Sequence, residues 1–372
     1  MVLLLLQRDY TLISGWMKNE TLFCSKGIYR FILFFLLILL IFSLLTAITF
    51  GNADISIIQI YQVILYELTH KASLAVYASG PIHDVIWLIR LPRVLLAAEI
   101  GMSLAVSGAV MQAVVRNPLA DPYVLGISSG ACLGATLAIL FGIGSFLGID
   151  FVGLMGFAGA FAASLLVLSI AGFGSSSSSV GRLILAGMAV NSVCSAFSDF
   201  ALYLANDRNA TAEVTYWLFG SLSGANYKKV LFLFPVFFLC ILFLWTQSRS
   251  FNLMLLGDET AITLGHNLKK YRILYLLLIS CMVGFSVYAA GMIGFIGLIV
   301  PHAVRILFGT DYRRLIPVCA YVGAIFLVWA DVASRIILKN SEMPVGILVS
   351  MIGAPCFIYL MVKRTNKSGK DC

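Results

Sequence analysis

Long apolar stretches separated by short polar ones form the main pattern of this 372-residue chain. Most are close to the length of about 20 residues that a helix needs to cross a membrane. They lack the alternation that is typical of β-barrel strands, and lipid offers no partner for unpaired backbone groups, so we expect helices. The pattern predicts ten spans, at 28–50, 93–115, 123–141, 151–171, 183–204, 230–245, 273–290, 293–307, 315–333 and 345–362.

Three further segments do not fit a crossing helix. Residues 55–68, ISIIQIYQVILYEL, are mixed in character and predict a helix that lies on the membrane surface. Residues 212–224, AEVTYWLFGSLSG, are too short to cross and end in glycine, which predicts a re-entrant or surface helix. The serine-rich run at 172–182 predicts a flexible loop.

The longest polar interruption of the C-terminal half is residues 249–272, RSFNLMLLGDETAITLGHNLKKYR. It contains two helix-forming pieces, at 252–256 and 259–264, which are joined at Gly257 and followed by Gly265. Glycine is favoured just beyond a helix end, because it adopts positive φ without a Cβ penalty. We therefore expect a short helical hairpin at the membrane surface, placed where a partner outside the membrane can bind it.

Composition supports the same fold class. The chain is 60% hydrophobic and 11% charged, whereas soluble domains are about 25% charged. We predict an all-α polytopic membrane protein and interpret the net charge of +8 as topology signals and lipid contacts, with no nucleic-acid partner. Most lysines and arginines fall on the side of the N-terminus. We therefore expect a cytoplasmic extension at 1–26, a membrane domain at 27–363, a cytoplasmic tail at 364–372 and a cytoplasmic segment 249–272.

Few residues suggest chemistry. The sequence has no phosphate-binding loop, no metal-ligand spacing and no nucleophile motif, so we expect neither an enzyme nor a bound cofactor or metal. Glu99 and Asp199 fall inside predicted spans. A carboxylate in a membrane is costly and is a functional-site hypothesis by default. The alternative is a group that is hydrogen-bonded locally or that lines a wet cavity.

Three arginines fall at the outer ends of predicted spans. Arg90 and Arg93 precede the second span, and Arg335 follows the ninth, four residues after Asp331. That spacing allows Asp331 and Arg335 to pair on one helix face. The arginines either reach lipid headgroups or form a cationic docking surface for an acidic partner.

Three motifs resemble signatures of the FecCD family, the BtuC-like permease subunits of type II ABC importers. They are RLPRVLLAAEIGMSLAVSGAVMQAVVRNPLADPYVLGISSGA at 90–131, GFIGLIVPHAVRILFGTDYRRLIPV at 294–318 and ADVASRIILKNSEMPVGILVSMIGAPCFIYLM at 330–361. The resemblance extends over residues 90–362, and motifs of this length and order are highly specific. The position of Glu99, expected to be apolar, departs from the family pattern.

The resemblance implies a BtuC-like fold of ten transmembrane helices per subunit. Two such permease subunits, identical or homologous, would enclose a pathway in the bacterial cytoplasmic membrane, with both termini cytoplasmic. Two cytoplasmic ATPase subunits would power it, and an external substrate-binding protein would deliver the cargo. Residues 249–272, the coupling segment, would dock on the ATPase. By resemblance, Arg90, Arg93 and Arg335 would meet the binding protein, and Asn117, Pro118 and Leu119 would form a cytoplasmic gate. The coupling residues would be Leu256, Gly257, Asp258, Glu259, Ala261, Leu264 and Gly265.

The implied function is ATP-driven import of a metal chelate. A ferric siderophore is the first expectation, with haem or cobalamin next. The alternative from another class is a proton-coupled secondary transporter that uses Glu99 or Asp199. An intramembrane enzyme is disfavoured, because no pair of catalytic groups lies at a common depth.

Overall fold

The computed structural model describes residues 26–51, 53, 55–71, 76–142, 145–146, 149–172, 180–264, 268–338 and 341–368. These residues are almost entirely helical. The elements of the first half are α2 (Lys26–Thr49), α3 (Ile57–Thr69), α4 (Pro81–Asp84), η2 (Val85–Arg90), α5 (Leu91–Val115), η3 (Pro122–Leu125), α6 (Ile127–Leu140), β1 (Ser145–Phe146), β2 (Ile149–Asp150) and α7 (Phe151–Ile170). Those of the second half are α8 (Val180–Ala205), α9 (Arg208–Leu218), α10 (Tyr227–Thr246), α11 (Ser248–Leu256), α12 (Asp258–Thr263), α13 (Lys269–Ala290), α14 (Ile296–Phe308), α15 (Tyr312–Ile336) and α16 (Val345–Ser368).

Within the described residues, seven helical runs are long and apolar enough to cross a membrane. Shorter apolar helices follow at Ile127–Leu140, Ile296–Phe308 and Val345–Tyr359, and together these account for the ten predicted segments. The segment predicted as a surface helix forms α3, and a capping box made by Ser56 and Gln59 stabilises its start. The all-α prediction is confirmed apart from a two-stranded antiparallel pair, β1 and β2.

Helix α5 lies at the centre of the molecule, and nearly all of its residues are buried. Glycines permit the close contacts around it. A Cβ atom at Gly101 would lie 2.2 Å from the carbonyl oxygen of Gly323 on α15, and one at Gly108 would meet Gly297 on α14. Helices approach this closely where small residues meet, which is the usual packing mode inside membranes.

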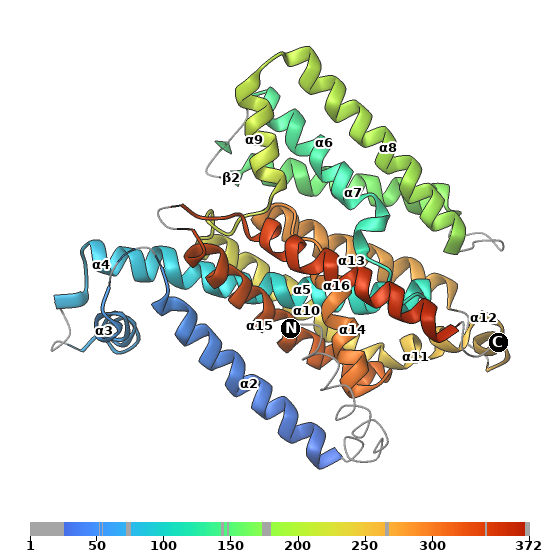
Figure 1. Cartoon of the computed structure of the whole chain (residues 1–372), viewed down its shortest axis with the longest axis horizontal. Coiled ribbons are helices and arrows are strands. Elements are labelled where there is room, and N and C mark those ends of the chain that lie inside the picture. Colours follow the sequence, from blue (N-terminus) through green and yellow to red (C-terminus); the bar gives the residue numbers. More distant parts are fainter. Residues whose placement is uncertain are drawn as a thin grey trace.

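Helices α2, α10, α13, α14 and α15 pack around α5, and a further layer lies outside them (Figure 1). Helices α6, α7, α8 and α9 pack together as one layer, and α13 joins α7 to α5. Helix α2 lies on the other side and packs against α15. The short elements α3 and α4 lie at one end of the long axis, and α11 and α12 lie at the opposite end (Figure 1). These are called the α4 end and the α12 end below.

Two boundaries differ from the sequence-based prediction. The second span was expected to start after Arg93, but a continuous helical run begins at Pro81 and includes the π-helical turn η2. A wider turn lets the chain pass Pro92, which lacks an N–H group and clashes with the preceding turn of an α-helix. The helix expected within 212–224 is α9, and it begins earlier because the side chain of Asp207 caps it at Asn209 N.

Candidate functional site

The coupling segment forms the expected pair of short helices, α11 and α12, joined at Gly257. The pair lies at the α12 end of the bundle (Figure 1). Three apolar side chains of this pair face outward, with Leu256, Ile262 and Leu264 each more than half exposed, whereas Ala261 is buried. Asp258 and Glu259 open α12, and Gly265 lies outside the described residues. An exposed apolar patch on a projecting hairpin is typical of a protein-docking surface.

Aromatic packing fixes α11 to the bundle. The ring of Phe251 is fully buried, with centroid distances of 4.6 Å to Tyr275 and 5.5 Å to Tyr312. Asn252 adds two hydrogen bonds: its Nδ2 donates to Asp311 Oδ1 at 2.8 Å, and its Oδ1 accepts from Tyr312 N at 2.9 Å. Motion of α11 would therefore be transmitted directly to the start of α15.

Tyr312 continues this connection into α5. Its hydroxyl donates to the carbonyl oxygen of Ala109 at 2.9 Å. Arg305 on α14 donates from Nη2 to Gln112 Oε1 at 2.9 Å and to the Tyr312 hydroxyl at 3.2 Å. The coupling segment is thus tied by polar contacts to three helices, α5, α14 and α15, and such networks rigidify the elements that they join.

The hinge between α11 and α12 depends on glycine. Gly257 has φ 101° and ψ 161°, a conformation that L-residues adopt only under strain. A Cβ atom at this position would lie 3.4 Å from Nη1 of Arg116, the residue that ends α5. The hinge of the coupling segment therefore lies next to the loop that follows α5.

That loop carries the residues expected to form a gate, Asn117, Pro118 and Leu119, which are all half-buried. It is a tight turn: Asn117 O accepts from Ala120 N at 3.0 Å, and Asn117 Oδ1 accepts from Leu119 N at 3.0 Å. Asparagine favours this geometry, because its side chain mimics a backbone turn. A firm turn beside the hinge is suited to pass a displacement of the coupling segment to α5 and η3.

The three arginines predicted to dock a partner lie together at the α4 end, but they are buried. Exposures are 4% for Arg90, 5% for Arg93 and 3% for Arg335. Arg93 Nε donates to Asp331 Oδ1 at 2.9 Å, and its Nη1 donates to Glu342 Oε2 at 2.7 Å. Arg335 Nε lies 3.1 Å from Asp331 Oδ2, an ion pair whose geometry is not that of a hydrogen bond. The predicted pairing of Asp331 with Arg335 is confirmed.

The other donors of this arginine cluster are used by backbone carbonyls. Arg90 donates to the carbonyls of Ile48 and Ala53, at 3.2 and 2.8 Å. Arg335 donates to Phe50 O at 2.7 Å and to Ala47 O at 3.3 Å. These carbonyls belong to the end of α2 and the segment after it, so the cluster joins α2, α5 and α15. A partner could use these guanidinium groups only by first breaking contacts inside the chain.

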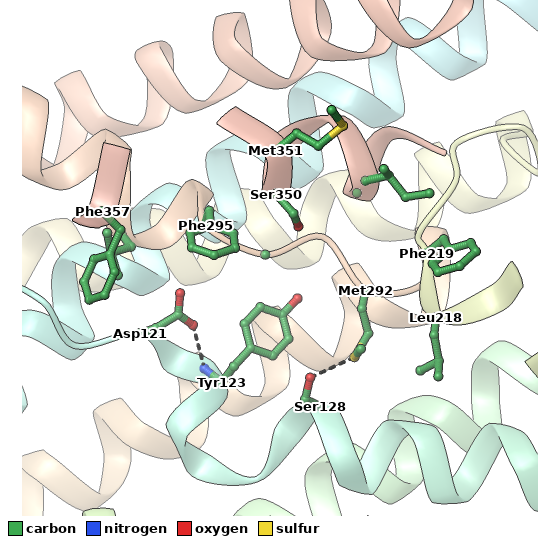
Figure 2. Close-up of a pocket in the computed structure, with 14 residues that line it drawn as sticks. Asp121, Tyr123, Ser128, Leu218, Phe219, Met292, Phe295, Ser350, Met351 and Phe357 are labelled. Atoms are coloured by element: carbon green, nitrogen blue, oxygen red, sulfur yellow. Dashed lines mark hydrogen bonds between the residues drawn. The ribbon is translucent and has the colours of Figure 1, made fainter. Parts of the chain in front are cut away.

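A cavity of about 750 Å³ lies where the helices are interrupted (Figure 2). We call it the main cavity. Helices α6 and α14 are shorter than a membrane crossing, and each is preceded by irregular backbone or a 3-10 turn. Such backbone is tolerated at membrane depth only where protein buries it or where it lines a cavity. Here Met292, Gly294 and Phe295 before α14, and Asp121 and Tyr123 at η3, line the main cavity.

Side-chain contacts hold the irregular segments in place. The hydroxyl of Tyr123 donates to Ile293 O at 3.2 Å, and Ser128 Oγ contacts Met292 Sδ at 2.9 Å (Figure 2). Phe295 adopts φ 65°, which is a strained value for an aromatic residue. Strain of this kind is stored at functional sites, so this wall of the cavity is a candidate for the substrate pathway.

The lining of the main cavity is mostly apolar, with aromatic and thioether groups from Phe219, Phe295, Phe357, Met292 and Met351. Met351 lies on α16, across the cavity from Tyr123 and Met292 in Figure 2. Such a surface suits a large, flat or apolar cargo, and its few polar groups would hold that cargo weakly.

Asp121 is the carboxylate of this lining. Its Oδ1 accepts from Tyr123 N at 2.8 Å. Burial raises the pKa of the Asp121 carboxyl from an ordinary 3.8 to about 6, against the opposing effect of that backbone hydrogen bond. Burial therefore favours the protonated form of the Asp121 carboxyl.

The two intramembrane carboxylates, Glu99 and Asp199, do not form a common site. Glu99 is 4% exposed and faces a separate cavity between α2, α5, α10 and α15. Asp199 is exposed on α8, a helix that packs against α6 and α7. Among the described residues, no lining residue is shared by Glu99's cavity and the main cavity. A proton relay between the two carboxylates has no support in this arrangement.

Sequence reasoning missed the main-cavity residues Met292, Phe295 and Asp121, and it missed Asn252 as the anchor of the coupling segment. One signal was present in the sequence: glycines are dense in 126–148 and 284–297, which indicates close helix packing or irregular backbone beside a pathway.

Comparison with known proteins identifies the family. The model of the FecCD transport family matches residues 38–363. The hemin transport system permease protein HmuU of Yersinia pestis is 41% identical over 292 residues, which are 76% of this chain and 85% of the relative. The vitamin B12 import system permease protein BtuC of Salmonella typhi is 40% identical over 284 residues, 76% of this chain and 84% of the relative.

A solved structure agrees with these relatives. It is an inward-facing metal-chelate type ABC transporter, and it superposes with a TM-score of 0.74 at 32% identity, over 90% of this chain and 99% of its own. PsaBC of Streptococcus pneumoniae superposes with a TM-score of 0.52 at 17% identity, over 75% of this chain and 93% of its own, which shows a shared fold alone. The coupling segment, the interrupted helices and these likenesses together place the chain in the FecCD transport family, as a multi-pass membrane permease subunit of an ABC importer that leaves ATP hydrolysis to a separate subunit.

Proposed function

We propose that this chain carries a metal chelate of the tetrapyrrole class, haem or cobalamin, across the bacterial cytoplasmic membrane. The relatives described above are a hemin permease and a vitamin B12 permease. The ferric siderophore that we expected first is named by neither of them. The main cavity, with its aromatic and thioether lining, supports a large and partly flat cargo over a small ion.

The observation that carries the proposal is the coupling segment with its apolar outer face. We infer that an ATPase subunit holds Leu256, Ile262 and Leu264 in a groove and moves them when it binds and hydrolyses ATP. Phe251 and Asn252 then pass the motion to α15, and the Gly257 hinge passes it to the loop that holds Asn117. We propose on this basis that the coupling segment, the α12 end and both termini lie in the cytoplasm.

The exposed face of α8 supports a second permease subunit as a partner. Asn191 and Asp199 are exposed and Ser195 is half-buried on one stripe, at four-residue spacing. A carboxylate that faces lipid is costly, so such a stripe is expected to face a water-filled pathway or another subunit. We propose that two permease subunits meet along α8 and enclose the pathway, with Asp199 on its wall.

The arginine cluster belongs at the outer surface in this orientation, where the external binding protein would dock. Because Arg90, Arg93 and Arg335 are buried, we propose that they support the docking surface from within and do not themselves contact the binding protein. Glu99 is assigned no role in the pathway.

The test is transport by the reconstituted complex. The chain would be expressed with its genomic neighbours, purified with its ATPase and placed in proteoliposomes with the binding protein. We expect ATP-dependent uptake of haem or cobalamin, and none when the ATPase active site is inactivated. Uptake driven by a proton gradient without ATP would overturn the proposal, and ATP-dependent uptake of a ferric siderophore alone would overturn only the cargo.

A further inference from the structure

A second cavity, of about 340 Å³, opens between α2, α10 and α15, away from the main cavity. We call it the side groove. Its walls are almost entirely apolar and include Leu33, Phe234, Phe238, Trp245 and Ile316. Several of these side chains are strongly exposed, among them Phe234 at 52% and Phe238 at 55%. The side groove therefore faces the membrane, and its natural occupant is hydrocarbon.

The length of the side groove matches one leaflet. Along α10 it runs from Phe234 to Trp245, which at about 1.5 Å per residue is roughly 16 Å. Half of a hydrocarbon core of about 30 Å is roughly 15 Å. Glu99 lines one part of the groove, and Trp245, next to the last residue of α10, lines its other end, so the groove has the length to hold one acyl chain in the leaflet at the α12 end.

A polar cavity of about 340 Å³ adjoins the open end of the side groove. It is lined by Tyr29, Arg30, Trp245, Asp311, Arg313 and Arg314. Three of these are cations and one is an anion, so its lining carries a formal net charge of +2. We call Arg30, Arg313 and Arg314 the cationic rim. Arg30 and Arg313 are exposed, and Arg314 lies over the ring of Tyr29, 5.8 Å from its centroid.

Trp245 joins the two cavities. It lines both of them, and its indole Nε1 donates to the carbonyl oxygen of Arg313 at 3.0 Å. Tryptophan and tyrosine are favoured at the membrane interface, and arginine binds phosphate oxygens with its planar fork of donors. An apolar channel one leaflet long that ends in an aromatic and cationic rim has the chemistry of a phospholipid site.

We propose that the side groove and the cationic rim bind one anionic phospholipid, with an acyl chain between α2, α10 and α15 and the phosphate on Arg30, Arg313 and Arg314. The assignment of this lipid to the cytoplasmic leaflet rests on the orientation given under the proposed function. The binding of the lipid by the side groove and the cationic rim does not depend on that orientation.

The carboxyl at the deep end distinguishes a lipid from a polar ligand. Glu99 Oε2 has no hydrogen-bond partner in the described part of the chain. A ligand with a polar group at its inner end would use that oxygen. A lipid places only the end of its alkyl chain there, so its binding would tolerate the replacement of Glu99 by an apolar residue.

The site also adjoins the coupling segment. Asp311 Oδ2 lies 4.0 Å from Arg314 Nε, and Asp311 Oδ1 accepts from Asn252 Nδ2 on α11 at 2.8 Å. A phosphate on the cationic rim would compete with Asp311 for Arg314. Occupancy by the lipid would thereby alter the restraint on α11, so we expect an anionic lipid to change the rate of coupled ATP hydrolysis in the assembled transporter.

The test is fluorescence quenching of the full chain in detergent by phosphatidylglycerol with brominated acyl chains. It needs neither ATPase nor cargo, so its failure is distinguishable from a failure of the proposed function. The chain has five tryptophans, so we expect a saturable component of quenching that comes from Trp245 and is absent in Trp245→Phe, over the background from the other four. Arg30→Gln, Arg313→Gln and Arg314→Gln together should weaken it on the order of 100-fold, at about fivefold per arginine. The control, Arg208→Gln with Lys228→Gln, changes two exposed cations that do not line either cavity of the site and should have no effect.

Further measurements distinguish an anionic phospholipid from other ligands of the site. Brominated phosphatidylcholine should quench weakly, and excess inorganic phosphate should not displace the lipid, because a free anion gains nothing from the side groove. Glu99→Leu should quench at least as well as wild type. The proposal is overturned if the saturable component persists in Trp245→Phe, if the triple variant matches the control, or if Glu99→Leu abolishes binding. Quenching that appears only after deletion of residues 1–25 would show that this segment fills the groove.

Discussion

The replacement of Asp331 by alanine tests whether the arginine cluster is internal structure or a docking surface. Asp331 is fully buried and lies between two guanidinium groups, Arg93 Nε at 2.9 Å and Arg335 Nε at 3.1 Å. Asp331→Ala leaves both cations buried without their shared counter-ion. Removal of one partner of a buried ion pair costs about 3–5 kcal/mol.

A loss of that size is measurable as a shift of the thermal midpoint in detergent. At about 2 °C per kcal/mol, which is the low end for large domains, the midpoint should fall by roughly 6–10 °C. The control is Glu342→Gln, because the side chain of Glu342 is 41% exposed in its pair with Arg93. Glu342→Gln leaves Arg93 with its counter-ion Asp331 and removes a partly exposed carboxylate, so we expect a loss of about 1 kcal/mol and a fall of the midpoint of no more than about 2 °C.

A third variant separates the loss of charge pairing from the loss of volume. Arg93→Met, Asp331→Leu and Arg335→Met together remove the whole charged group, and apolar replacements of buried ion triads are often neutral or stabilising. We expect most of the lost stability to return. An unchanged midpoint in Asp331→Ala, together with weakened capture of the co-expressed binding protein, would refute this account and return the arginines to the docking surface.

Three further predictions follow from the hinge and the main cavity. Gly257→Ala should reduce ATP-coupled transport strongly while leaving expression intact, because φ 101° costs a residue with a Cβ about 1–3 kcal/mol. The control is Gly224→Ala, whose added Cβ would meet only Lys229 Nζ at 3.8 Å. Equal transport by the two variants would contradict the role of Gly257 as a hinge. The folded chain raises the pKa of Asp121 from 3.8 to about 6, so the contribution of this carboxyl to stability falls as pH rises through that window. The thermal midpoint of Asp121→Asn, relative to that of wild type, should therefore be higher at pH 7.5 than at pH 5. An equal difference between the two midpoints at both pH values would exclude the raised pKa. Tyr123→Phe removes the hydrogen bond to Ile293 O and should lower stability by about 1 kcal/mol and impair uptake of the cargo, whereas unimpaired uptake would remove Tyr123 from the pathway wall.

The sequence determined the helices and the local hinges of this protein. Lipid forces apolar stretches into helices, so the ten segments could be predicted from hydropathy, with errors at their ends that are largest for the second span, whose helical run begins at Pro81. Gly257 and the pairing of Asp331 with Arg335 were also predictable, because each depends on residues close together in the chain. The docking role of residues 249–272 stays a prediction from the family resemblance, and it too was drawn from a stretch that is contiguous in sequence.

Only the tertiary structure decided what each side chain faces. In a soluble helix the apolar face marks the core, but in a membrane the lipid-facing side is apolar too, so the sequence of α5 or α10 does not distinguish packing from exposure. Arg93 looked like a surface cation and is buried against α15. Glu99 looked like a pathway carboxylate and faces the side groove. The main cavity arises where η3 meets the irregular start of α14, about 170 residues apart in the chain, and only the packing of helices across that distance brings them together.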